Sequence, residues 1–140
     1  MPTAAEPWLV DTSAAVAMLV ADHEQHEQTF AALSGRRLGL CGHAAFESYS
    51  VLTRLPGVQR LSPPVARRLL TANFPQTRHL GAEAARALLA ALSEHRIAGG
   101  AVYDALVAAA AVEHGLVLVS RDRRAAQTYQ RLGARVELLV

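Results

Sequence analysis

Short apolar runs alternate with longer amphipathic stretches along most of the chain. The runs rich in Leu and Val predict buried strands at 8–10, 37–41, 116–120 and 135–140, with a further short strand at 77–80. Apolar residues at helical spacing predict helices at 14–19, 23–34, 43–55, 63–74, 83–95, 101–114 and 123–132. Strands that alternate with helices are typical of a parallel sheet covered on both faces.

Glycine, proline and serine mark the expected ends of these elements. Gly35 and Gly115 stand just after predicted helices, where a left-handed residue commonly ends a helix, and Gly133 stands before the last strand. Ser62 precedes Pro63 and is a candidate N-cap for the helix that Pro75 ends. The boundaries therefore agree with the apolar pattern.

The length of 140 residues predicts a single domain spanning 1–140, in which residues 1–7 form a flexible lead-in. Apolar residues make up 51% of the chain, but 28 positions are Ala and only 5% are aromatic. We therefore expect closely packed helices around a modest sheet. No apolar run reaches the roughly 18 residues that a membrane-spanning helix needs. Because Asp11 and Glu6 also break the pattern of a signal peptide, a cytoplasmic protein is expected.

The basic residues and the cysteine exclude several classes of chemistry. All 14 basic residues are Arg, so no mechanism that needs a catalytic Lys is available, and the P-loop pattern is absent. Cys41 is the only cysteine, which excludes a disulfide framework or a thiolate metal cluster and fits a reducing compartment. We expect Cys41 to be a small buried side chain.

Two of the four Asp residues follow predicted strands. Asp11 comes directly after the strand 8–10, and Asp122 comes just after the strand 116–120. In open α/β sheets, ligands bind beyond the carboxyl ends of the strands, so both residues are candidates for a site at that edge. A simpler interpretation is that each caps the helix that follows it.

Two further acids lie in otherwise apolar helices. Asp104 could favour the N-terminus of its helix through the helix dipole, and Glu47 could reach water. None of the four acids shows a basic partner at helical spacing, and clustered carboxylates raise one another's pKa. A hard divalent cation, Mg²⁺ or Mn²⁺, would neutralise such a cluster of oxygen ligands.

Four acidic motifs follow one another along the chain: "VDTSA", "AAFESYSVLTRLPG", "GGAVYDALVAAAA" and "LVLVSRDRRA". In this order they resemble the motifs of PIN-domain ribonucleases, and in particular the toxin component of bacterial VapBC toxin–antitoxin pairs. The resemblance covers nearly the whole chain. It implies a PIN-like three-layer α/β/α fold with a central, mostly parallel sheet.

The resemblance also implies a site and an activity. The catalytic and metal-binding acids would be Asp11, Glu47, Asp104 and Asp122, with Ser13 and Ser120 as the hydroxyls that orient them. Asp11 and Asp104 match the motifs best, whereas Arg121 occupies a variable position and receives no role. The implied activity is an endoribonuclease dependent on Mg²⁺ or Mn²⁺. Its partners would be an RNA substrate, a cognate antitoxin protein and a second copy of the chain.

Two other functions remain open at this point. A phosphoryl-transfer α/β domain also uses an Asp at a strand end, but such folds need a late Lys or its Arg substitute, and one class needs an Asp-x-Asp motif that Asp11-Thr12-Ser13 lacks. The other alternative is a PIN-like binding module without activity. Cleavage of a mixed RNA pool would separate all three.

The other groups of polar residues in the sequence do not match a catalytic or metal-binding pattern. His23 and His26 are three apart, whereas a zincin needs its two histidines four apart, and Ser13 lacks the Gly-x-Ser-x-Gly elbow of hydrolases. The remaining histidines are expected to be ordinary surface or helix-end residues: His43, His79, His95 and His114. The three arginine pairs, which either contact phosphates or are solvated, are 36–37, 67–68 and 123–124.

Overall fold

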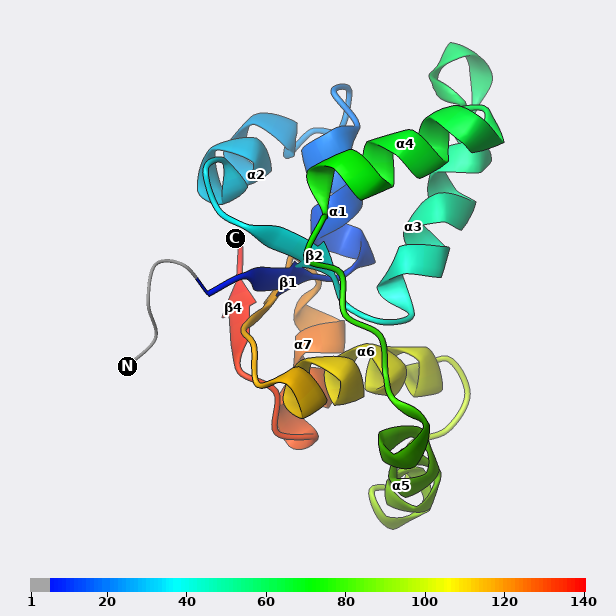
Figure 1. The fold of residues 1–140 in the computed structure, drawn as a ribbon, viewed down its shortest axis with the longest axis vertical. Helices are drawn as coiled ribbons and strands as arrows, with labels where there is room; N and C mark the ends of the chain where they lie inside the picture. Colours follow the sequence, from blue (N-terminus) through cyan, green and yellow to red (C-terminus); the bar gives the residue numbers. More distant parts are fainter. Residues whose placement is uncertain (1–5) are drawn as a thin grey trace.

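The computed structural model describes residues 6–140 and has a parallel sheet at its centre (Figure 1). In the order in which they lie side by side, the strands are β2 (Leu38–Leu40), β1 (Trp8–Val10), β3 (Leu118–Ser120) and β4 (Val136–Leu138). All pairings between them are parallel. The two central strands, β1 and β3, therefore end at the same edge of the sheet, and the residues that follow them emerge together there.

Helices cover both faces of this sheet, as Figure 1 shows. They are α1 (Thr12–Leu19), α2 (His26–Leu33), α3 (Ala44–Thr53), α4 (Pro63–Asn73), α5 (Ala82–Glu94), α6 (Ala101–His114) and α7 (Arg123–Arg131), with a short 3₁₀ helix at Gly57–Gln59. The predicted three-layer α/β/α fold is confirmed.

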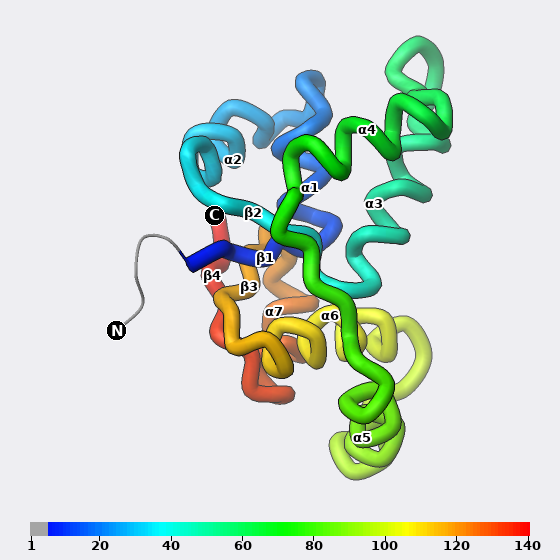
Figure 2. The backbone as a smooth tube through the Cα atoms, in the orientation of Figure 1, coloured from blue at the N-terminus to red at the C-terminus, as the bar shows by residue number. Residues whose placement is uncertain are grey.

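Alternation along the strands divides the core into two halves. Val10 and Val119 point into the half that α1, α3 and α4 cover, whereas Leu9 and Leu118 point into the half that α6 and α7 cover. The alanines of α6 and α7 allow these helices to approach the sheet closely, as the composition predicts. The helix α5 packs on α6 through Leu88 and lies away from the sheet (Figure 2).

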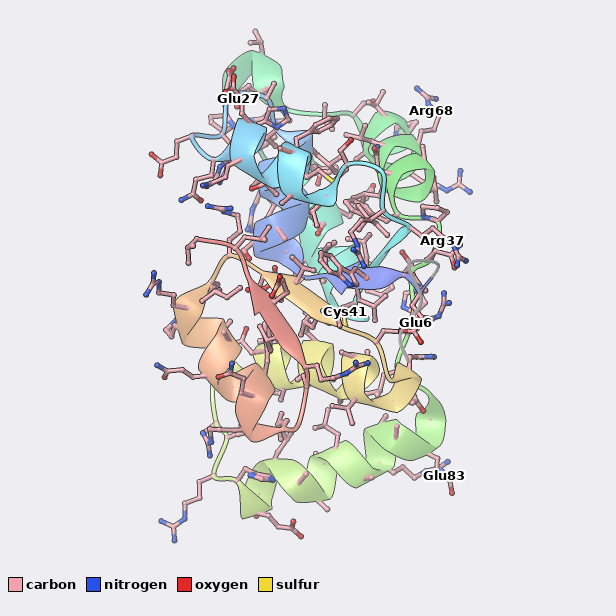
Figure 3. All side chains as sticks on the ribbon, turned by 90° about the vertical axis from the view of Figure 1, so that its left-hand side faces the viewer. Glu6, Glu27, Arg37, Cys41, Arg68 and Glu83 are labelled. Atoms are coloured by element: carbon pink, nitrogen blue, oxygen red, sulfur yellow. The ribbon has the colours of Figure 1, made fainter. Side chains whose placement is uncertain are left out.

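Cys41 is fully buried between the layers, near the centre of the view in Figure 3. Its thiol donates to the carbonyl of Val107 at 3.0 Å. Burial, followed by the charge of Asp11, raises the pKa of the thiol to about 12, so it stays protonated. The expectation of a small buried side chain is confirmed.

The segment 74–80 is not the strand expected at 77–80. It crosses β2 and forms two isolated bridges, Gly39 with Pro75 and Cys41 with Arg78. The crossing is close, because a Cβ on Gly39 would collide with the backbone carbonyl of Gln76. The hydroxyl of Thr77 accepts the Leu40 N–H at 2.9 Å, where a strand would offer a carbonyl. The segment 74–80 therefore hydrogen-bonds to the edge strand β2 without forming a strand of the sheet itself.

Several predicted boundaries shift by a few residues. The helix expected from residue 23 begins at His26, after turns, and Ser62 occupies the N-cap position of α4 without a side-chain hydrogen bond. Gly115 ends α6 with φ of 64°, as expected. Of the lead-in at 1–7, residues 1–5 lie outside the described residues, and Pro7 is buried. No helix between residues 6 and 140 is long and apolar enough to cross a membrane.

Candidate active site

Asp11 lies between the end of β1 and the start of α1, at the edge of the sheet where the parallel strands have their C-terminal ends. Its Oδ1 accepts the Ala14 N–H at 3.0 Å and the Ser13 hydroxyl at 2.6 Å. Its Oδ2 accepts the hydroxyls of Ser120 at 2.6 Å and Tyr129 at 2.9 Å. The cap that the simpler interpretation predicts is present, but three of these four bonds come from side-chain hydroxyls that a cap does not require.

The carboxylate of Asp11 is almost completely buried, with 3% of the residue exposed. Burial raises its pKa, and the hydrogen bonds from Ser120, Ser13, Ala14 and Tyr129 act against that rise by stabilising the charged form. A carboxylate has about four lone-pair directions, and four donors reach Asp11 here. Asp11 is therefore held in position, and a metal ion bound to it would replace at least one of these donors.

Ser13 and Ser120 connect Asp11 to the turn that follows β3. The Ser13 hydroxyl accepts the Arg121 N–H at 2.9 Å, and the Ser120 hydroxyl accepts the Asp122 N–H at 3.0 Å. The two hydroxyl oxygens lie 3.4 Å apart. Both serines thus contact Asp11 directly, and they join the first and the last acidic motif across the two central strands.

Asp122 caps α7, as its simpler interpretation predicts. Its Oδ1 accepts the backbone N–H groups of Arg124 at 3.0 Å and Ala125 at 3.1 Å. The guanidinium of Arg124 lies 4.0 Å from Oδ2, on the exposed side. One carboxylate oxygen is therefore committed to the helix, and the other faces the solvent side of the site.

Asp104 lies in the first turn of α6 and is half-buried. Within residues 6–140 no hydrogen-bond donor reaches its carboxylate. Burial raises its pKa, the charge of Arg124 lowers it, and the charges of Asp122, Glu47 and Asp11 raise it further. The four predicted acids are therefore near enough for each of the other three to act on Asp104.

Glu47 joins the site from the first turn of α3. Its Oε2 accepts the Thr12 hydroxyl at 3.3 Å, and its Oε1 lies 3.3 Å from Nε2 of His43. The expectation that no acid has a basic partner at helical spacing is therefore wrong, because His43 stands four residues before Glu47. Arg124 is a second basic neighbour of the acids, although the fold and not helical spacing brings it to Asp104.

A family model for the PIN domain matches residues 8–130, which include all four acids. The chain belongs to the PIN-domain family. Ribonuclease VapC27 of Mycobacterium tuberculosis is 48% identical over 130 residues, which cover 93% of this chain and 95% of that protein. The predicted family is thus confirmed over nearly the whole length.

Solved structures share the fold at lower identity. VapC20 of Mycobacterium tuberculosis, a sarcin-ricin loop cleaving toxin, has a TM-score of 0.68 and 18% identity, covering 87% of this chain and 94% of that chain. The DNA-bound VapBC of Salmonella typhimurium has a TM-score of 0.63 and 19% identity, covering 96% and 98%. These likenesses establish the PIN fold.

The donor set of this PIN domain fits a hard divalent ion in its chemistry. The acids come from four separate elements, and they offer only oxygen atoms, which are the ligands that Mg²⁺ and Mn²⁺ prefer. The pKa of the Asp104 carboxylate is raised by burial and by three neighbouring acids, and none of the described residues donates a hydrogen bond to it, so added positive charge nearby would be favourable. In the described part of the chain, however, no three His, Cys, Asp or Glu side chains lie close enough together to hold a metal ion. Binding an ion would therefore require these side chains to move.

Tyr129 belongs to this site but was not predicted from the sequence. The same is true of Thr12 and His43, which contact Glu47. Tyr129 lies on α7, is 2% exposed, and donates to Asp11 from 118 positions further along the chain. Burial raises its pKa first, and the charge of Asp11 raises it further, so the hydroxyl remains a donor. A signal was present, because Tyr129 continues the buried face of Ala125 and Ala126, and a buried Tyr hydroxyl usually finds a partner.

Arg121 turns away from the acids. Its Nε donates to Gln25 at 2.8 Å, and its Nη2 donates to Gln28 at 3.2 Å, which ties the turn after β3 to α2 and its preceding turn. These contacts hold the Arg121 side chain on the α2 side of the turn, and it was assigned no role in the site.

Proposed function

We propose that this PIN-domain protein is an endoribonuclease and that it acts as the toxin of a toxin–antitoxin pair. The observation that carries the proposal is the hydrogen-bonded set around Asp11, in which Ser13 and Ser120 join this carboxylate to the turn that carries Asp122. The charges of Asp122, Glu47 and Asp11 also act on Asp104, whose pKa is raised first by burial and then by these charges. A ribonuclease that is 48% identical over nearly its full length supports the reaction class.

We further propose that Asp11, Asp104 and Asp122 hold Mg²⁺ or Mn²⁺, and that Glu47 completes the site as a ligand or by positioning water. Such an ion, when bound, polarises a phosphate oxygen and lowers the pKa of a water molecule. Asp11 supplies a fixed anchor, because four donors hold it. Ser13 and Ser120 hold Asp11 in a fixed position relative to the turn that carries Asp122.

Glu47 is suited to act on water because its side chain is 41% exposed and has two partners that leave it accessible. The Thr12 hydroxyl holds one oxygen and His43 faces the other. This arrangement leaves the Glu47 carboxylate accessible to water.

The proposed partners are an RNA substrate, a cognate antitoxin and a second copy of the chain, in the cytoplasm. An antitoxin segment that carries Arg would pair with the unsatisfied Asp104 carboxylate and compete with the metal ion. A DNA-bound VapBC from Salmonella typhimurium shares the fold, in line with an antitoxin partner. Co-expression with the adjacent small gene product should yield a complex that has lost cleavage. A tight complex that still cleaves RNA would contradict blocking at the active site.

Cleavage of a mixed RNA pool tests the proposed activity. The purified protein should cleave the pool in Mg²⁺ or Mn²⁺ and should stop when the metal is chelated with EDTA. The inactive binding module predicts RNA binding without cleavage under every condition. Cleavage that survives exhaustive chelation would contradict the metal part of the proposal alone.

A further inference from the structure

A groove opens between α3, α4 and the segment that crosses β2. Its volume is about 1160 Å³. The helix α3 contributes Phe46 and Tyr49, α4 contributes Arg67 and Arg68, and the crossing segment contributes His79. Figure 2 shows the two helices side by side, with the crossing segment passing below α4. The groove lies outside the set of acids described above.

The charge of the groove is positive. Arg67 and Arg68 are both exposed, and no Asp or Glu is among the described residues that line the groove. Figure 3 shows Arg68 on the outer side of its helix. An anionic ligand therefore matches this side of the groove.

Exposed aromatic rings continue from the groove to the acids. Phe46 is 65% exposed, and its ring centroid lies 5.9 Å from that of His79. Tyr103 is 52% exposed and stacks on His43, with centroids 5.1 Å apart and planes at 25°. His43 and Phe46 are three residues apart at the start of α3, so they lie on one side of the helix. We call these four residues, Tyr103, His43, Phe46 and His79, the aromatic track.

The aromatic track runs directly into the candidate active site. His43 is 3.3 Å from Glu47, and Tyr103 immediately precedes Asp104. In Figure 2 the first turn of α3 lies above the first turn of α6, in line with the stacking of His43 on Tyr103. A chain that passed along the track would enter between two of the proposed catalytic acids.

We propose that the aromatic track stacks the unpaired bases of single-stranded RNA, and that Arg67 and Arg68 contact its phosphates. The proposal rests on the ribonuclease function given above and names the substrate form that the site receives. Exposed rings beside a basic groove are the combination that binds single strands, because every base offers a face for stacking. A duplex already stacks its bases internally and has none to offer.

RNA is favoured over a protein occupant by the kind of surface that is exposed. The track presents ring faces beside arginines and ends at a cluster of acids that would handle a phosphodiester. The floor of the groove is apolar, with Leu40, Ala45 and Leu70 in its lining, so a second copy of the chain or an antitoxin helix is the alternative occupant. Competition with such partners is an outcome that the following test separates.

The test measures binding of a fluorescein-labelled, mixed-sequence single-stranded RNA by fluorescence anisotropy in EDTA, with the full chain. Phe46→Ala and Tyr103→Ala should each raise Kd by between about fivefold and about 150-fold. Phe30→Ala is the matched control, because Phe30 is 48% exposed and lies 5.8 Å from His26 at a similar tilt. It should leave Kd unchanged, and so should every variant tested on the corresponding duplex.

Salt dependence tests the two arginines separately. Replacing Arg67 and Arg68 with Gln should reduce the slope of log Kd against log salt concentration by about 0.7 for each phosphate that these arginines neutralise. Phe46→Ala should leave that slope unchanged, because stacking releases no counterions. Equal slopes for the wild type and the arginine variant would overturn the pairing of these arginines with phosphates.

Three results would overturn the aromatic track. The first is that the Phe46→Ala and Tyr103→Ala variants bind RNA with the same Kd as the wild type, while their melting temperatures show that both are folded. Another is light scattering in which Phe46→Ala converts a dimer to a monomer, which would make the groove a subunit interface. The third is loss of antitoxin binding with unchanged RNA binding. If the wild type cleaves RNA and the Phe46→Ala variant has the same KM as the wild type, only the aromatic track is contradicted. A wild type that neither binds nor cleaves RNA contradicts the proposed function itself.

Discussion

Tyr129→Phe removes one oxygen atom from the interior of the protein, the donor at 2.9 Å from Oδ2 of Asp11. The phenyl ring remains, and it still packs between α7 and the sheet because Tyr129 is 2% exposed. The perturbation is therefore confined to one hydrogen bond on a buried carboxylate. A hydrogen bond to a charged group contributes about 1.5–3 kcal/mol, and we expect the free energy of unfolding at neutral pH to fall by about that amount.

The loss should depend on pH with a defined sign. The Tyr129 hydrogen bond stabilises the charged form of Asp11, so the substitution raises the pKa of Asp11 beyond the rise that burial already causes. The difference in stability between the wild type and the variant is then largest above the raised pKa of the variant. It should shrink as the pH falls through the interval between the two folded-state pKa values, because Asp11 takes up a proton in both proteins.

Urea unfolding at a series of pH values measures both quantities. The matched control is Tyr103→Phe, in which the same atom is removed from a residue that is 52% exposed. The control should change the free energy of unfolding by less than about 0.5 kcal/mol. If Tyr129→Phe is as stable as the control at neutral pH, then the hydrogen bond to Asp11 does not hold the site together, and the reasoning is refuted.

The remaining predictions concern the sheet edge, the metal ion and the acid cluster. Gly39→Ala should lower the free energy of unfolding by about 1–3 kcal/mol or more in a urea melt, because its Cβ would collide with the carbonyl oxygen of Gln76. Gly100→Ala, with nothing within 4 Å, is its control, and equal stability of the two variants would contradict the close crossing. Ca²⁺ should support RNA cleavage poorly compared with Mg²⁺, because it binds at longer and looser distances, and equal rates would argue against a tight octahedral site. Because the pKa of Asp104 is raised, the native state takes up a proton there at a higher pH than the unfolded chain does. The contribution of Asp104 to stability therefore declines as the pH rises from the unfolded-state pKa through the folded-state pKa. Asp104→Asn should flatten this part of the profile of unfolding free energy against pH, and an unchanged profile would count against it.

The sequence predicted the layers of the fold because those depend on local patterns. Leu9 and Val10 alternate between the two halves of the core, and the positive φ of Gly115 ends α6 where its position suggested. Asp11 and Asp122 could be assigned to one edge of the sheet because parallel strands impose it. Each of these expectations needs only neighbouring residues and a general rule.

Contacts between distant elements could not be predicted in this way. The Tyr129 hydroxyl reaches Asp11 only because α7 packs against β3 and β4. The backbone of Gln76 lies against Gly39 only because β2 is at the edge of the sheet. The partnership of His43 and Glu47 was visible in the sequence as a spacing of four. It was missed because only Arg was counted among the basic residues.

Asp104→Asn tests the central claim most directly, with thermal melts in EDTA and in Mg²⁺ beside a cleavage assay on a mixed RNA pool. The substitution keeps the shape of the side chain and removes one charge from the cluster. We predict that it abolishes cleavage and leaves the metal-free protein at least as stable as the wild type. Mg²⁺ at a hundred times its Kd should stabilise the wild type by about 2.7 kcal/mol and the variant much less. Glu94→Gln, an exposed acid on α5, should behave as the wild type in every assay. An Asp104→Asn protein that cleaves RNA at the wild-type rate and responds equally to Mg²⁺ would contradict the account.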